Sequence, residues 1–176
     1  KLYNANGVVL ASSGGGKRFF TKLMISRLLL NGTKVMVVDP QAEYIDLVKM
    51  FNGELITISR TSDTIINPLD LMGHDYDEKK LTLMDLFPVM IGETSEIQKA
   101  TLDRALTKVY KNKSITNDPK SWNYEPPIME DLLNQLKDMS KEATIVERET
   151  YRSLINRIEM YVTGVFGFLN KQTNIN

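Results

Sequence analysis

The 176-residue sequence has no cysteine and only one histidine, and its charges cancel. Without cysteine the chain has no disulfide framework, no thiolate metal site and no cysteine nucleophile. One histidine, His74, is too few for a histidine-based zinc site, so no metal ligands are predicted. The 22 basic and 22 acidic residues give no net positive field, so the charge does not support DNA as a partner. No apolar run approaches the roughly 20 residues that span a bilayer.

What the chain does contain is the composition of a globular protein. Its hydrophobic fraction is 42% and its charged fraction 25%, which excludes a collagen-like or fully disordered chain. The length corresponds to about one average domain. Because the sequence starts at Lys1 and strand-like residues follow almost at once, we expect a piece cut from a longer protein.

The first 60 residues alternate between two hydrophobic patterns. Short apolar runs at residues 7–11, 34–39 and 55–58 predict strands, and the segments 17–30 and 43–51 predict helices. A run that is apolar on both faces is typical of a strand buried in a parallel sheet. The order strand, helix, strand, helix, strand therefore predicts an α/β fold with a mostly parallel sheet.

From residue 75 onward the pattern turns helical. Ser95 and Gln98 have the spacing of a capping box before one helix. The strongest periodicity in the chain, with spacings of three and four, belongs to Tyr151, Leu154, Ile155, Ile158 and Val162. We therefore predict an α/β segment over residues 1–74, an all-α insertion over 75–163, and a return toward the α/β core over 164–176.

A glycine-rich turn between the first predicted strand and helix carries the chemistry. Such a loop points backbone N–H groups at a phosphate, the helix N-terminus adds partial positive charge, and a lysine reaches the outer phosphates. The P-loop pattern is G-x-x-x-x-G-K-[ST]. We therefore predict a nucleotide-phosphate site formed by Ser12, Ser13, Gly14, Gly15, Gly16, Lys17, Arg18 and Phe19.

Two positions depart from the P-loop pattern. Ala11 replaces the first glycine, which is a mild change, and Arg18 replaces the Ser or Thr whose hydroxyl normally holds Mg²⁺. Arginine has no lone pair to ligate a cation, so Mg²⁺ is doubtful here. A plain glycine-rich turn is the structural alternative. A dinucleotide site is disfavoured, because Phe19 stands where the third glycine would be and Lys17 has no role in that scheme.

Several other residues keep two readings open. Asp39 ends an apolar run that predicts a buried strand. An apolar strand that ends in an acid is also the Walker B pattern. Glu43 follows four residues later and either polarises a water for attack on a γ-phosphate or is an exposed acid at a helix start. Arg148, Arg152 and Arg157 either include a trans-acting arginine or a DNA contact, or form a solvated helix face.

The sequence resembles the conjugative type IV secretion ATPases, the TraC/TraE-like proteins of the FtsK–HerA branch of P-loop motors. The resemblance covers nearly the whole chain in order. It rests on the P-loop region at 6–17 and 19–22, the D-P-x-x-E-Y segment at 37–44, the I-N-P-L-D segment at 66–70, and residues 161–176, which resemble the lead-in to that family's Walker B strand.

The resemblance implies a RecA/FtsK–HerA-like P-loop NTPase fold whose sheet is incomplete in this chain. It implies the ATP-binding portion of a bacterial motor ATPase that energises type IV secretion and conjugative transfer of DNA. Lys17 and Glu43 would be its catalytic residues, ATP its ligand, and Mg²⁺ the family's metal. The full-length protein would form a homo-oligomer, such as a hexamer. Its partners would be other type IV secretion components, in the cytoplasm at the inner face of the cell membrane.

The departures suggest a second function. Arg18 occupies the metal-binding position, and the chain stops just before the segment where the family's Walker B acids would lie. We therefore expect this piece to be inactive alone. The alternative function is a non-hydrolytic protein-interaction module. In such a module the P-loop is degenerate and the helical region docks onto partners.

Overall fold

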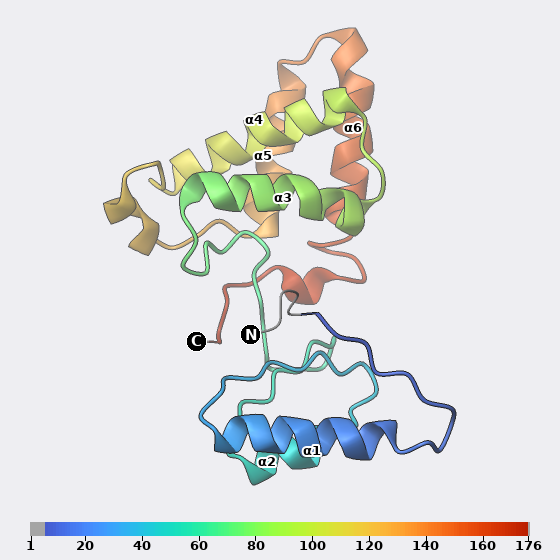
Figure 1. The fold of residues 1–176 in the computed structure, drawn as a ribbon. Coiled ribbons are helices and arrows are strands. Elements are labelled where there is room, and N and C mark those ends of the chain that lie inside the picture. Colours follow the sequence, from blue (N-terminus) through green and yellow to red (C-terminus); the bar gives the residue numbers. More distant parts are fainter. Residues whose placement is uncertain (1–5, 176) are drawn as a thin grey trace. The chain divides into compact units, whose positions relative to one another are not determined.

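The computed structural model describes residues 6–175 and divides the chain into two compact units, residues 1–56 and 57–176. Regular structure in the described residues is entirely helical (Figure 1). The helices are α1 (Lys17–Leu30), α2 (Ile45–Met50), α3 (Tyr76–Ile91), α4 (Glu96–Asn112), α5 (Met129–Lys141) and α6 (Ile145–Glu159), with short 3₁₀ turns η1 (Pro119–Asn123) and η2 (Gly167–Leu169). No helix within residues 6–175 combines the length and the apolar character that crossing a membrane requires.

The predicted parallel sheet is wrong for the described residues. The segments 7–11, 34–39 and 55–58 form no β-ladder. Most of their apolar side chains are exposed; Met36 is 90% exposed and Val38 is 86% exposed. The physical reason is that an apolar run indicates only that a segment can be buried. A strand exists when its N–H and C=O groups pair with a neighbour, and between these segments such pairing is absent.

The first unit is built around α1, and the helix predicted over 17–30 is confirmed. Helix α1 begins directly after Gly16 and ends before Asn31-Gly32. Beyond this end, the Thr33 N–H donates a hydrogen bond to the Leu28 carbonyl at 3.0 Å. Ile25 and Leu47 are the buried residues of α1 and α2. This unit therefore positions its loops around one helix rather than around a large apolar core.

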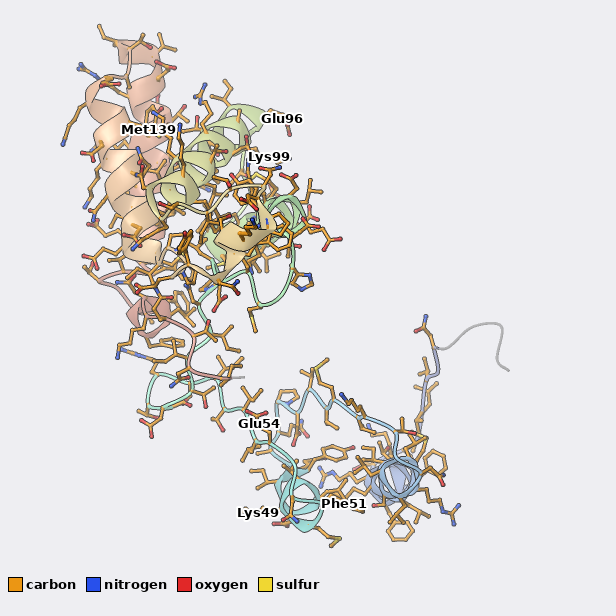
Figure 2. The ribbon with its side chains drawn as sticks, turned by 90° about the vertical axis from the view of Figure 1, so that its left-hand side faces the viewer. Lys49, Phe51, Glu54, Glu96, Lys99 and Met139 are labelled. Atoms are coloured by element: carbon orange, nitrogen blue, oxygen red, sulfur yellow. The ribbon has the colours of Figure 1, made fainter. Side chains whose placement is uncertain are left out.

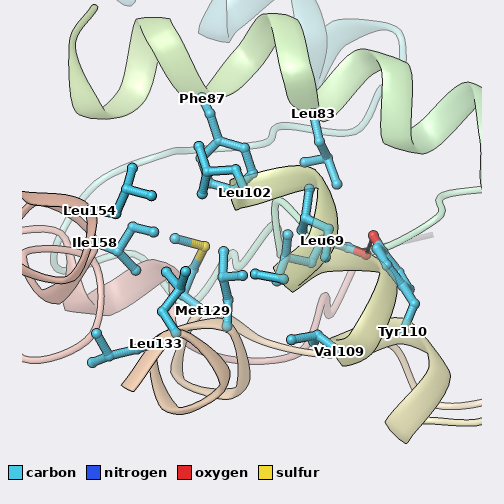
Figure 3. Packing of buried hydrophobic residues seen from close by; sticks show 14 of the residues in the cluster. Leu69, Leu83, Phe87, Leu102, Val109, Tyr110, Met129, Leu133, Leu154 and Ile158 are labelled. Carbon is cyan, nitrogen blue, oxygen red and sulfur yellow. Dashed lines mark hydrogen bonds between the residues drawn. The ribbon is translucent and has the colours of Figure 1, made fainter. Parts of the chain in front are cut away.

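The second unit holds the hydrophobic core, where α3, α4, α5 and α6 pack together (Figure 1). The helices expected from the spacing of apolar residues are confirmed there. Figure 3 shows side chains from all four helices converging, with Leu69 from the preceding loop among them. The Tyr110 hydroxyl donates a 2.6 Å hydrogen bond to the Leu69 carbonyl, so this buried phenol is satisfied (Figure 3).

Local sequence signals fix the helix ends of this unit. The capping box is confirmed: the Ser95 N–H donates to Gln98 Oε1 at 2.9 Å and the Gln98 N–H donates to Ser95 Oγ at 3.3 Å. Within the first turn of α4, Lys99 Nζ forms an ion pair with Glu96 Oε1 at 2.8 Å (Figure 2). Helix α3 continues through Pro88 and ends at Ile91 before a glycine. These signals are local, which is why they can be read from sequence.

The two ends of the second unit meet at Asn67. Its N–H donates to Thr173 Oγ1 at 3.1 Å, and its side-chain amide donates to the Pro127 carbonyl at 2.8 Å and to Gln172 Oε1 at 3.3 Å. The Asn174 N–H donates to the Ile65 carbonyl at 3.2 Å. The segment that enters the helical bundle is thus tied to the segment that leaves it.

Candidate phosphate-binding site

The glycine-rich loop has a backbone shape suited to an anion. Gly14 has φ 76° and Gly16 has φ 78°, both in the left-handed region, and Gly15 between them does not. The Gly15 N–H closes the turn on the Ser12 carbonyl at 3.0 Å. Left-handed residues next to right-handed ones make the concave arrangement of N–H groups that binds anions. Glycine adopts these angles without the steric cost of a side chain.

Gly15 leaves little room for a side chain. A Cβ added there would lie 3.0 Å from the Ser12 carbonyl oxygen and 3.3 Å from the Ala11 methyl group. The loop leads straight into α1, whose first intrahelical bond runs from the Phe20 N–H to the Gly16 carbonyl at 2.9 Å. The amides before Phe20 therefore lack helical partners, and the helix dipole favours negative charge beside them.

Lys17 is a cation without an internal partner at the end of this loop. Its side chain forms no hydrogen bond or ion pair with residues 6–175, and the first turn of α1 contains no acid. The Lys17 carbonyl accepts the Thr21 hydroxyl at 2.8 Å, which is a bond within the helix. The loop and first turn of α1 thus hold all eight predicted phosphate-site residues in one stretch of the first unit.

Arg18 and Glu43 are brought together by the fold. The Arg18 guanidinium forms an ion pair with the Glu43 carboxylate. The arginine side chain is 69% exposed, whereas that of Glu43 is only 20% exposed. This places the acid of the D-P-x-x-E-Y segment next to the N-terminal turn of α1. It also means that the acid already has a cationic partner, which neither reading of Glu43 from the sequence included.

The loop carrying Glu43 is itself held by two further contacts. Asp39 Oδ2 accepts the Tyr44 N–H at 2.9 Å, so this carboxylate closes the loop before α2. The Lys22 ammonium lies 5.7 Å from the centre of the Tyr44 ring. Sequence reasoning missed Lys22 and Tyr44. The available signal was spacing, because Arg18 and Lys22 are four apart on a helix and therefore share a face.

The residues present do not fit a magnesium ion in the usual way. Mg²⁺ takes oxygen ligands in near-octahedral geometry. At the hydroxyl position of the loop stands the Arg18 guanidinium, which has only donors and a positive charge. The next hydroxyl along α1, Thr21, donates to the Lys17 carbonyl, and Glu43 is ion-paired. Among residues 6–175 there is no cluster of three acidic or histidine side chains that could hold a metal.

The arginines of α6 take different roles in the structure. Arg157 Nη1 donates to the Ile91 carbonyl at 3.3 Å and to the Glu93 carbonyl at 2.9 Å, so it caps the end of α3. Arg152 is exposed on the same helix. Arg157 is therefore neither a free trans-acting arginine nor a plain solvated residue. The side chain of His74 is exposed, and its Nδ1 lies 3.6 Å from Glu78 Oε2.

The glycine loop that opens α1 thus has the local geometry expected of a P-loop. Lys17 is unpaired among the described residues, and Glu43 lies beside the loop in its ion pair with Arg18. The family described as "Helicase HerA, central domain" matches residues 7–176. The chain therefore belongs to this family, and the expected membership of the FtsK–HerA branch is confirmed.

The fold is similar to a solved structure, that of VirB4 of Thermoanaerobacter pseudethanolicus. The TM-score is 0.71 and the sequence identity 24%, and the match covers 88% of this chain and 52% of that chain. The chain thus spans about half the length of this relative. At this identity the match establishes a shared fold. Among curated proteins, no match is found.

Proposed function

We propose that this chain carries the nucleotide-binding site of a motor ATPase that energises type IV secretion and conjugative transfer. Three observations support the proposal: membership of the HerA central-domain family, the VirB4-like fold, and the sequence segments shared with TraC/TraE-like proteins. ATP is the proposed ligand. DNA is not proposed as a direct ligand of this chain, because 22 basic and 22 acidic residues give it no net charge.

The observation that carries the proposal is the junction of the glycine loop and α1. Left-handed Gly14 and Gly16 shape the loop, and Lys17 stands at the helix start without a carboxylate partner. In this arrangement the loop amides bind the inner phosphates and Lys17 binds the outer ones. Lys17 would stabilise negative charge that develops on a transferring γ-phosphate, and Glu43, if released from Arg18, would orient the attacking water.

Nucleotide binding by two lysine variants tests this site. Lys17→Ala removes the phosphate-binding ammonium and should weaken ATP binding by at least about tenfold, since each tenfold corresponds to about 1.4 kcal/mol. Lys34→Ala is the matched control, because Lys34 is also an exposed lysine of the first unit without an ion-pair partner in the described residues. Isothermal titration calorimetry measures both. Equal ATP affinity in the two variants would refute the proposed site.

We further propose that the full-length protein works as a homo-oligomer, such as a hexamer, with other type IV secretion components at the cytoplasmic face of the membrane. The support is the resemblance to TraC/TraE-like proteins, whose assemblies have this organisation. Sedimentation velocity of the full-length protein, with and without ATP, measures the oligomer. A monomer in both conditions at micromolar concentration would contradict this part of the proposal.

A second candidate function is a non-hydrolytic protein-interaction module. The ion pair between Arg18 and Glu43 favours it, because the acid expected to activate water is held by a cation. Steady-state ATP hydrolysis by the full-length protein distinguishes the two functions. A turnover within about tenfold of the typical enzymatic median of roughly 10 per second supports a motor. ATP binding without turnover supports the module.

A further inference from the structure

Two cations on one face of α1 hold the loop that follows Asp39. Arg18 pairs with Glu43, and Lys22, one helical turn later, lies over the Tyr44 ring at 5.7 Å. The Asp39 carboxylate closes the same loop on the Tyr44 N–H at 2.9 Å. The guanidinium is thereby kept beside the glycine loop, immediately after Lys17. A charged group with five donors thus stands where P-loop proteins place the hydroxyl that binds the metal.

A bound nucleotide requires positive charge at this position. The phosphates of ATP carry several negative charges, which Lys17 alone does not neutralise. A metal ion normally supplies the rest, yet the side chains here do not fit Mg²⁺. The Arg18 guanidinium can donate two parallel hydrogen bonds to a phosphate, in the same way that it binds a carboxylate. It already binds one oxyanion, the Glu43 carboxylate, in the structure.

We propose that Arg18 replaces the magnesium ion at this site, exchanging its Glu43 partner for nucleotide phosphate, so that the chain binds nucleoside di- and triphosphates free of metal. The inference rests on the proposed nucleotide site and deepens it. The exposure of the two partners supports the exchange: Arg18 is largely in solvent and can swing, whereas Glu43 is mostly covered and stays in its loop. The guanidinium therefore has two alternative anionic partners, one internal and one from the nucleotide.

A consequence is that Glu43 competes with the nucleotide for Arg18. Glu43→Gln removes the internal carboxylate and frees the guanidinium, so metal-free nucleotide affinity should rise, by about threefold or more. A Glu43 that acted only on a water molecule would leave binding affinity unchanged, since it would not contact the phosphates. Binding measurements on this variant thus separate a partner of Arg18 from a residue that serves the chemical step alone.

The experiment is ATP titration by calorimetry in excess EDTA and in excess MgCl₂. For the unsubstituted chain the dissociation constants in the two conditions should agree within about twofold. Arg18→Ser should weaken binding in EDTA by about tenfold or more, and Mg²⁺ should restore part of that loss through the new hydroxyl. Arg18→Lys should fall between them, because a lysine keeps the charge but not the paired donors. Arg27→Ser is the matched control, since Arg27 is exposed on the same helix.

Three results would overturn the proposal. ATP binding by the unsubstituted chain that requires Mg²⁺ overturns the replacement but leaves the nucleotide site in place. Unchanged EDTA affinity in Arg18→Ser also overturns it. No ATP binding in either condition overturns both this inference and the proposed function. Circular dichroism of every variant establishes that helix content is unchanged, so a loss of affinity is not a loss of fold.

Discussion

Arg157 on α6 donates from its guanidinium to the carbonyl of Ile91, the last residue of α3, across 66 positions of sequence. The same nitrogen donates to the Glu93 carbonyl at 2.9 Å. Helix ends leave carbonyl groups without intrahelical partners, and a cation there also matches the negative end of the helix dipole. Arg157 therefore joins two helices of the second unit through the loop that follows α3.

Arg157→Ala should lower the free energy of unfolding by about 1–3 kcal/mol, because the Ile91 carbonyl loses a charged donor in a partly buried bond. Arg152→Ala is the control on the same helix and should stay within about 0.5 kcal/mol of the unsubstituted chain, since Arg152 is exposed. Urea titration followed by the fluorescence of Trp122 reports on this unit, because this single tryptophan packs against its core. Equal midpoints for the two variants would show that the contact contributes nothing.

Asn67→Ala should destabilise the second unit by about 2–4 kcal/mol. The substitution removes the amide donors to Pro127 and Gln172 and the acceptor of the Leu69 N–H at 3.0 Å, in a fully buried site. The control is Asn112→Ala. The side-chain amide of Asn112 donates a hydrogen bond to Gln135 Oε1 at 3.0 Å, but at an exposed position. The same urea titration measures both, and a cost below about 0.5 kcal/mol for the Asn67 variant would contradict its role in closing the bundle.

Tyr110 makes stability depend on alkaline pH. Burial, and then the nearby Tyr76 and Asp70, raise the pKa of its phenol above the ordinary value of 10.0. The folded state therefore keeps the proton while the unfolded state begins to lose it near pH 10. Below pH 10 the contribution is complete, and above it the free energy of unfolding should fall by up to about 1.4 kcal/mol per pH unit.

Tyr110→Phe tests this sign. At pH 7 the variant should lose about 1 kcal/mol, because the hydrogen bond to the Leu69 carbonyl is gone. Above pH 10 the difference from the unsubstituted chain should shrink, since phenylalanine has no proton to lose. Tyr124→Phe, at an exposed position, should leave the pH dependence unchanged. A difference that stays constant from pH 7 to pH 11 would rule out the Tyr110 titration as the cause.

The helices of the second unit were predictable because their signals are short-range. The Ser95 and Gln98 pair closes within one turn, and the spacing of Tyr151, Leu154 and Ile158 marks the buried face of α6. The shape of the glycine loop was predictable for the same reason, since glycines at a helix start set their own backbone geometry. In each case the residues that decide the structure lie within a few positions of one another.

The sheet and the partner of Arg18 were not predictable in this way. Strand pairing depends on a neighbour that a single apolar run does not specify, and residues 34–39 have no such pairing among the described residues. Arg18 and Glu43 lie 25 positions apart and meet because Ala42 adopts a left-handed φ of 56° and Asp39 closes the loop on Tyr44. Composition, helix periodicity and the glycine loop thus follow from local sequence, whereas the partners of Arg18, Asn67 and Arg157 follow from tertiary structure, because backbone turns and packing alone bring such distant residues within bonding distance.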